Sequence, residues 1–182
     1  FIENLGLVTV GARPKGFPRP ELMKNVYILA GARIQGVTFW VPIISILVLL
    51  VLLYLVYQTK MGMAMRAVSK DMETTRLMGV DVDRIILYTF ALGSALAGIG
   101  GVLWACKYPQ INPLMGTFPG WKAFTAAVVG GIGNVVGAMV GGFIIGLVEI
   151  MIVAFFPSLS GYRDAFVFSI LIIFLLVKPS GI

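Results

Sequence analysis

The sequence predicts an all-α, polytopic transmembrane domain, and three observations carry this prediction. Hydrophobic residues make up 59% of the 182 residues and charged residues only 12%, whereas about a quarter of a soluble domain is charged. The charges gather in clusters between long uncharged runs. Several of these runs reach the roughly 20 residues that a helix needs to cross about 30 Å of hydrocarbon. We therefore treat 1–182 as a single membrane domain, and we expect earlier spans to precede Phe1.

Three segments, uncharged apart from Lys178 at the end of the last, are expected to cross the membrane, completely or, for the short last one, in part: 37–58, 85–106 and 165–178. In the first, Trp40 lies near one end and Tyr57 near the other, as is typical of the aromatic belts at membrane interfaces. The second is rich in Ala and Gly, and small residues let helix backbones approach closely in lipid.

A fourth uncharged stretch, 123–156, is longer than one crossing needs and is interrupted by glycines. We predict a half-span over 123–131 and a full span over 135–156. A break inside the bilayer leaves backbone polar groups that only protein or a water-filled cavity can satisfy. Gly130, Gly131, Gly133 and Asn134 are therefore candidates to line a pathway. The alternative is one long tilted helix in which the glycines serve packing alone.

Glu149 is the single acidic residue within an apolar span. Ionisable groups at such depth are costly and usually face protein or water. A functional interpretation makes Glu149 a contact for a substrate ammonium group, a gate or a coupling residue. The alternative is a carboxylate near the interface that pairs with a neighbouring basic group.

The connecting segments differ in charge. Segment 59–84 holds five basic residues, whereas 107–122 holds only two. In membrane proteins the cytoplasmic loops carry an excess of Lys and Arg. We therefore expect 59–84 in the cytoplasm and both 1–36 and 107–122 outside. The five basic residues within 1–33 argue against this placement of the first segment.

Several chemistries are excluded by what the composition lacks. The chain has no histidine and one cysteine, Cys106, so we expect no catalytic constellation, no metal site and no cofactor. A Gly-x4-Gly-Lys-Ser/Thr phosphate loop is absent, so a different polypeptide would have to hydrolyse any ATP. The basic residues show no arrangement suited to nucleic acid.

Segment 59–84 contains the run Glu73-Thr74-Thr75-Arg76-Leu77-Met78-Gly79. This run resembles the cytoplasmic EAA motif of ABC importer permeases, with Thr in place of both Ala. Such a motif needs a short helix that projects to an ATPase and a Gly that ends it in a left-handed conformation. The alternative is an ordinary solvated loop.

Longer blocks extend the resemblance along the chain: TKMGMAMRAVSKD at 59–71, LMGV at 77–80, AGIGGVL at 97–103, KAFTAAVVGGIG at 122–133 and LVKPSG at 176–181. With them the chain resembles the high-affinity branched-chain amino-acid permeases of the LivH type. The resemblance implies a multi-pass permease subunit of the bacterial inner membrane, which carries Leu, Ile and Val. It also implies a second homologous permease, two cytoplasmic ABC ATPases and a periplasmic binding protein as partners. Permeases for urea or short-chain amides, and ion-driven amino-acid transporters, remain the alternatives.

Overall fold

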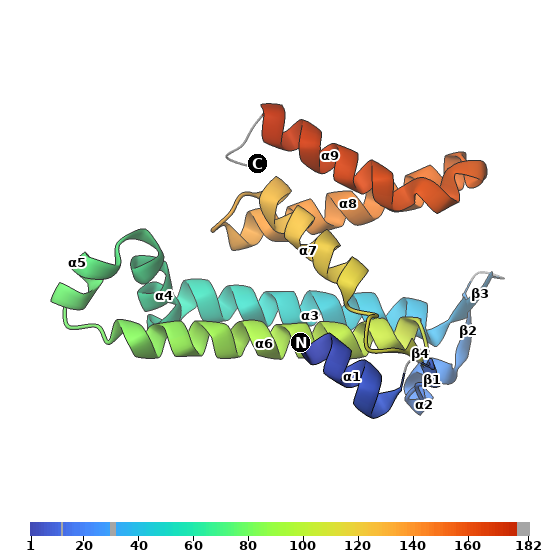
Figure 1. Ribbon diagram of the computed structural model, residues 1–182, viewed down its shortest axis with the longest axis horizontal. Coiled ribbons are helices and arrows are strands. Elements are labelled where there is room, and N and C mark those ends of the chain that lie inside the picture. Colours follow the sequence, from blue (N-terminus) through green and yellow to red (C-terminus); the bar gives the residue numbers. More distant parts are fainter. Residues whose placement is uncertain (12, 30–31, 178–182) are drawn as a thin grey trace. The chain divides into compact units, whose positions relative to one another are not determined.

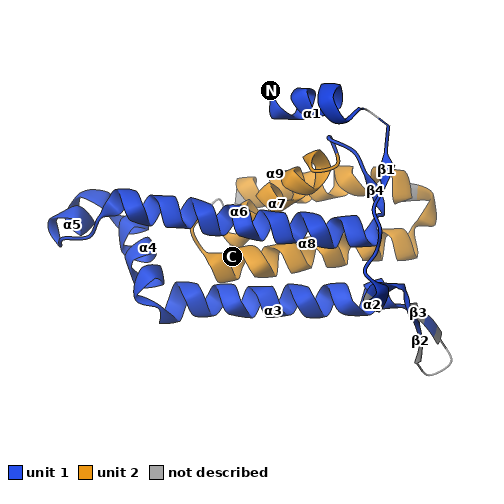
Figure 2. Cartoon of the chain, turned by 90° about the horizontal axis from the view of Figure 1, so that it is seen from below, with its two compact units in different colours: residues 1–114 blue, residues 115–182 orange. Residues whose placement is uncertain are grey.

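The computed structural model describes residues 1–11, 13–29 and 32–177, and helices dominate them (Figure 1). The all-α prediction is confirmed, with two small two-stranded sheets added to the helices. The chain divides into two compact units, Phe1–Leu114 and Met115–Ile182 (Figure 2).

Unit 1 is built on a hairpin of two long helices, α3 (Gly36–Gln58) and α6 (Val82–Lys107), which lie side by side (Figures 1 and 2). Two short helices connect them, α4 (Lys60–Lys70) and α5 (Met72–Leu77). Both long helices have the length and apolar composition of membrane spans. Their bounds extend the expected segments 37–58 and 85–106 by one to three residues.

The described residues among the first 36 form several short elements rather than a plain loop: α1 (Ile2–Val10), β1 (Lys15–Gly16), α2 (Glu21–Lys24), β2 (Val26–Leu29) and β3 (Ala32–Gln35). β2 and β3 form an antiparallel hairpin, and β1 pairs with β4 (Gln110–Ile111), so that Lys15 lies opposite Ile111. The side chain of Arg19 donates through Nε to the carbonyl of Cys106 at 2.9 Å.

These contacts bring α2, the strands β1 to β3 and β4 together at one end of the α3–α6 hairpin, whereas α4 and α5 lie at the other end (Figure 1). A small core at that first end contains Met23, Val37 and Cys106. Because the two ends of spanning helices lie on opposite sides of a membrane, unit 1 separates the two groups of connecting segments.

Unit 2 contains α7 (Thr117–Gly130), α8 (Val135–Phe155), the 3-10 helix η1 (Pro157–Tyr162) and α9 (Arg163–Val177). Of these, α8 has the length and composition of a span. Helix α7 begins six residues before the expected half-span, because Pro119 lies in its first turn, where a missing N–H costs no hydrogen bond. Helix α9 has 15 residues, which is shorter than a full crossing. Lys178, the last residue of the expected span, lies outside the described residues.

Candidate functional site

A sharp elbow joins the span α3 to the connecting helix α4. The hydroxyl of Thr59 caps α4 by accepting a hydrogen bond from the Gly62 N–H at 3.1 Å, and it donates to the carbonyl of Leu55 at 2.5 Å. A Cβ on Gly62 would lie 2.2 Å from the carbonyl oxygen of Val56. The first turn of α4 therefore packs directly against the last turn of α3, and only glycine permits this approach.

Helix α5 begins at a strong N-cap. Oδ1 of Asp71 accepts hydrogen bonds from the N–H groups of Glu73 at 2.9 Å and Thr74 at 3.1 Å, and the hydroxyl of Thr74 donates to the same carboxylate. The hydroxyl of Thr75 donates to the Asp71 carbonyl at 2.6 Å. The Thr74 hydroxyl, followed by the backbone N–H groups, lowers the pKa of Asp71, because these donors favour the ionised form. Thr74 thus supports the N-cap of this helix through both its N–H and its hydroxyl.

The end of α5 exposes an apolar tip. Leu77 is 87% exposed and Met78 is 79% exposed, and Gly79 follows with a φ of +82°. The seven candidate coupling residues, Glu73 to Gly79, therefore form one short helix and the turn that ends it. Gly79 has the left-handed conformation that the motif requires.

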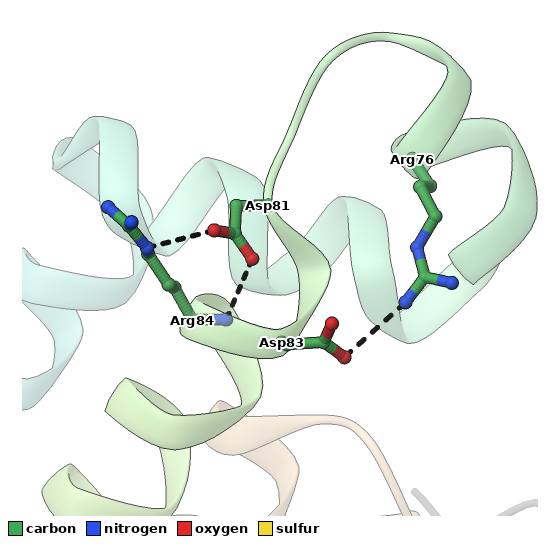
Figure 3. Close-up of polar contacts among 4 residues, drawn as sticks. All are labelled: Arg76, Asp81, Asp83 and Arg84. Carbon is green, nitrogen blue, oxygen red and sulfur yellow. Dashed lines mark hydrogen bonds and ion pairs between the residues drawn. The ribbon is translucent and has the colours of Figure 1, made fainter.

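One ion pair joins α5 to the start of α6, and a second lies within the start of α6 itself (Figure 3). Arg76 lies 3.3 Å from Asp83, and Arg84 lies 2.8 Å from Asp81. Asp81 also caps α6, because its Oδ1 accepts from the Arg84 N–H at 3.2 Å. Exposed pairs of this kind contribute about 0–1 kcal/mol each, so they orient the loop more than they stabilise the protein.

The glycine-rich break lies between α7 and α8. Gly131 has a φ of +95° and Gly133 a φ of +92°, so a continuous helix through this region is ruled out. Gly130 is the last residue of α7. Asn134 caps α8, with its Oδ1 accepting from the Gly137 N–H at 3.1 Å. The predicted break is therefore present, and its four candidate residues comprise a helix end, a turn and a cap.

Glycines also let α7 and α8 touch backbone to backbone. A Cβ on Gly137 would lie 1.9 Å from the Gly130 carbonyl oxygen, and one on Gly141 would lie 2.5 Å from the Ala126 carbonyl oxygen. Gly146, by contrast, has open space where a Cβ would be. The Gly137–Gly141 face of α8 thus packs against the preceding helix of the same chain.

Glu149 pairs with a base that the sequence analysis did not single out. Nζ of Lys122 lies 2.5 Å from Oε1 of Glu149 and 2.8 Å from Oδ1 of Asp164. The side chains of Lys122 and Glu149 are about one-fifth exposed. One ammonium group thus joins α7, α8 and the start of α9, as in the pairing alternative for Glu149. The sequence feature that could have indicated this role is that Lys122 is the single charged residue between Tyr108 and Val148.

The cavities of unit 1 that lie along the spans are apolar. One groove of about 430 Å³ runs between α3 and α6 and is lined by aliphatic residues such as Leu47, Val51, Leu92 and Leu96. Such a lining offers no partner for the ammonium and carboxylate groups of a free amino acid. In the described residues, no group of His, Cys, Asp and Glu has the geometry of a metal site.

Comparison with known proteins identifies the family of this chain. The family described as "Branched-chain amino acid transport system / permease component" matches residues 5–176. The chain belongs to this permease family. With the three apolar helices that have the length of spans, membership establishes a membrane protein, and it confirms the resemblance to LivH-type permeases.

Two named relatives align with the whole chain, and a third aligns with most of it. It is 37% identical to the high-affinity branched-chain amino acid transport system permease protein LivH of Escherichia coli K12, over 100% of the chain and 59% of that relative. It is 34% identical to the permease protein BraD of Pseudomonas aeruginosa, over 100% of the chain and 60% of that relative. The ribose import permease protein RbsC of E. coli K12 is 26% identical over 82% of the chain and 42% of its own length. The chain thus spans about three-fifths of the length of LivH and BraD, and no solved structure matches it.

Proposed function

We propose that this chain forms part of the translocation pathway of an ATP-driven importer of Leu, Ile and Val in the bacterial inner membrane. The observation that carries the proposal is the alignment of the whole chain with two permeases named for branched-chain amino acids. The more distant ribose permease supports the transport role but covers less of the chain and is less similar.

The proposed partners are those that the resemblance to LivH-type permeases implies: a homologous permease, two cytoplasmic ATPase subunits and a periplasmic binding protein. The given sequence contains no phosphate loop, which fits ATP hydrolysis by separate subunits. The apolar tip at Leu77 and Met78 suits a groove on such an ATPase, because docking would remove two highly exposed apolar side chains from water.

In the proposed mechanism, closure of the ATPase pair moves α5. The Arg76–Asp83 contact and the short turn at Gly79 carry this movement to the start of α6. The spans then shift between two packings that open the pathway to one side at a time, since the ATPase contacts favour one packing over the other. The break at Gly131–Asn134 is the proposed pathway element, because its backbone polar groups need protein or water around them.

Uptake measurements test the substrate class. The full-length permease and its own partner subunits should restore uptake of labelled leucine to cells that lack their branched-chain permeases. Uptake of labelled urea or acetamide instead would move the chain to the amide permeases. Leucine uptake that persists without any co-purifying ATPase, and that collapses with the ion gradient, would establish a secondary transporter.

Gly79→Asp tests the coupling role of Glu73–Gly79. A side chain at a φ of +82° costs about 1–2 kcal/mol and redirects the chain after α5, so ATPase co-purification and uptake should fall while membrane insertion stays normal. Ser69→Ala, at an exposed position of α4, is the matched control and should leave both unchanged. Normal uptake with normal ATPase capture in the Gly79 variant would refute this role.

Impermeant thiol labelling of intact cells tests the proposed sides of the membrane. Cys106 is buried, so new cysteines should report without background. Because Gln110 lies at the opposite end of unit 1 from α4, Gln110→Cys should label from outside and Ser69→Cys should label only after permeabilisation. The reverse pattern would invert the proposed topology.

A further inference from the structure

Helix α4 carries three basic residues and no acidic one: Lys60, Arg66 and Lys70. In the part of the chain that the structure describes, none of them belongs to an ion pair, whereas the nearby Arg76 and Arg84 are both paired (Figure 3). Uncompensated charge on a short helix repels itself. The α4 cations therefore suit an anionic partner outside the chain.

Arg66 and Lys70 are four residues apart, and Met63 precedes Arg66 by three, so these side chains share one face of the helix. All three are exposed. We call Met63, Arg66 and Lys70, together with Lys60, the basic face of α4. A face that mixes cations with an exposed methionine suits a boundary between headgroups and acyl chains.

The depth of α4 follows from the helix before it. Helix α3 has 23 residues, which at 1.5 Å per residue is about 35 Å, so its end reaches the headgroup layer beyond about 30 Å of hydrocarbon. The first turn of α4 packs against the last turn of α3 at Gly62. Both views show α4 running across the end of this span rather than continuing along it (Figures 1 and 2). Helix α4 thus lies at the level of the headgroups.

One cation marks the side of α4 that lipid reaches. The guanidinium of Arg66 lies over the ring of Tyr57, 5.0 Å from its centroid. Tyr57 belongs to the last turn of α3 and is 41% exposed, as expected of a tyrosine in the aromatic belt. Arg66 is therefore held beside the last turn of α3, at the depth where an aromatic belt is expected.

We propose that the basic face of α4 binds the headgroup of an anionic phospholipid. The site goes beyond the transport function proposed above and needs only that α3 spans the membrane. An acidic protein surface is the less favoured partner, because α5 presents the apolar tip while the α4 cations lie at headgroup level. Basic residues beside a span attract anionic lipid in proportion to their number, and salt weakens the attraction.

The test uses the full-length permease in neutral detergent, titrated with phosphatidylglycerol and separately with phosphatidylcholine, with bound lipid counted by native mass spectrometry. We expect phosphatidylglycerol affinity at low salt to fall about fivefold for each of the two cations removed in Arg66→Gln/Lys70→Gln. Lys15→Gln/Lys24→Gln removes two exposed cations at the opposite end of unit 1 and should change the affinity less than twofold. Phosphatidylcholine binding should be the same in all three proteins.

Other outcomes overturn the proposal. Equal phosphatidylglycerol affinity in the wild type and the α4 variant would remove the site, and an equal loss in both double variants would show attraction by net charge alone. Displacement of the lipid by millimolar glycerol 3-phosphate would indicate a site for a soluble phosphate. Loss of ATPase capture with unchanged lipid affinity would assign the basic face to the protein partner. Failure of leucine uptake in all variants would bear on the proposed function and leave the lipid result standing.

Discussion

Two turns contain glycines with a positive φ in different surroundings: Gly79 between α5 and α6, and Gly131 and Gly133 between α7 and α8. A Cβ on Gly79 would meet nothing within 4 Å, and the two side chains before it are almost fully exposed. The second turn directly follows Gly130, whose backbone touches Gly137 across the two helices. In the first turn glycine sets only the direction of the chain, whereas near the second it also sets how closely two helices pack.

The difference bears on what each turn can do. A tip with few contacts can dock and move without disrupting a core, and it belongs to the part of a structure that opens at low cost. A turn between two helices in backbone contact moves only with both helices. We therefore expect substitutions at the first turn to change coupling, and substitutions around the second turn to change stability as well.

The largest effect is expected for Gly137→Ala. Its Cβ would lie 1.9 Å from the Gly130 carbonyl oxygen, and backbone on both sides leaves no flexible side chain to yield. Forcing α7 and α8 apart should cost about 3 kcal/mol or more, at the upper end of overpacking penalties. The thermal unfolding midpoint of the purified permease in detergent measures this loss.

Gly146→Ala is the matched control, because it lies on the same helix with open space at its Cβ. Alanine is the better helix former by about 1 kcal/mol, so this variant should be as stable as the wild type or more so. Equal stability of the Gly137 and Gly146 variants would mean that α7 and α8 do not pack through these glycines.

A smaller effect is expected for Gly131→Ala and Gly133→Ala. A left-handed conformation costs a non-glycine residue about 1–2 kcal/mol, and space around Gly133 is open, so strain rather than collision should destabilise the latter variant. Leucine uptake should fall in both variants while membrane insertion persists, if the turn lines the pathway. Gly100→Ala, at an open position inside α6, is the control. Full uptake and raised thermal stability in the two turn variants would remove this turn from the pathway.

Spans and the glycine break were predictable from sequence because both depend on local composition. An uncharged run of sufficient length between Arg33 and Lys60 predicts α3, and a Gly-Gly-Ile-Gly-Asn run predicts a turn. The start of α7 was missed because a proline in a first turn resembles a proline in a loop. The pairing of β1 with β4 was missed because it joins residues almost 100 positions apart.

In the candidate site, too, local features were predictable from sequence and contacts between helices were not. The sequence indicated Glu73–Gly79 from its spacing and Glu149 from its isolation, but the Lys122–Glu149–Asp164 contacts depend on how three helices pack. Sequence alone does not show which isolated charges in apolar runs form a pair, because the pairing depends on how the fold places their helices. The left-handed Gly79 was predictable, whereas the exposure of Leu77 and Met78 required the structure.

The smallest expected effect is a difference in pH dependence between the N-caps of two helices, Asp71 for α5 and Asn134 for α8. Both side chains accept backbone N–H bonds, but only Asp71 titrates, and its pKa is lowered, first by the Thr74 hydroxyl. A lowered pKa means that the cap contributes its full stabilisation above the ordinary pKa of aspartate and loses it as the pH falls through the lowered value. Protection of the α5 amides from hydrogen exchange, corrected for intrinsic rates, should therefore decrease in acid below about pH 4, whereas protection at the start of α8 should not.

Asp71→Asn isolates the titrating group, because asparagine is an equally good N-cap and carries no charge. The variant should retain the protection of α5 at neutral pH and show a weaker decrease in acid than the wild type, while Glu73 is present in both proteins and cancels in the comparison. An identical acid response in the two proteins would mean that the Asp71 carboxylate does not hold the start of α5. The exposed tip would then depend on its ion pair with α6, and a variant such as Asp83→Asn, which breaks the contact to Arg76, should release it instead.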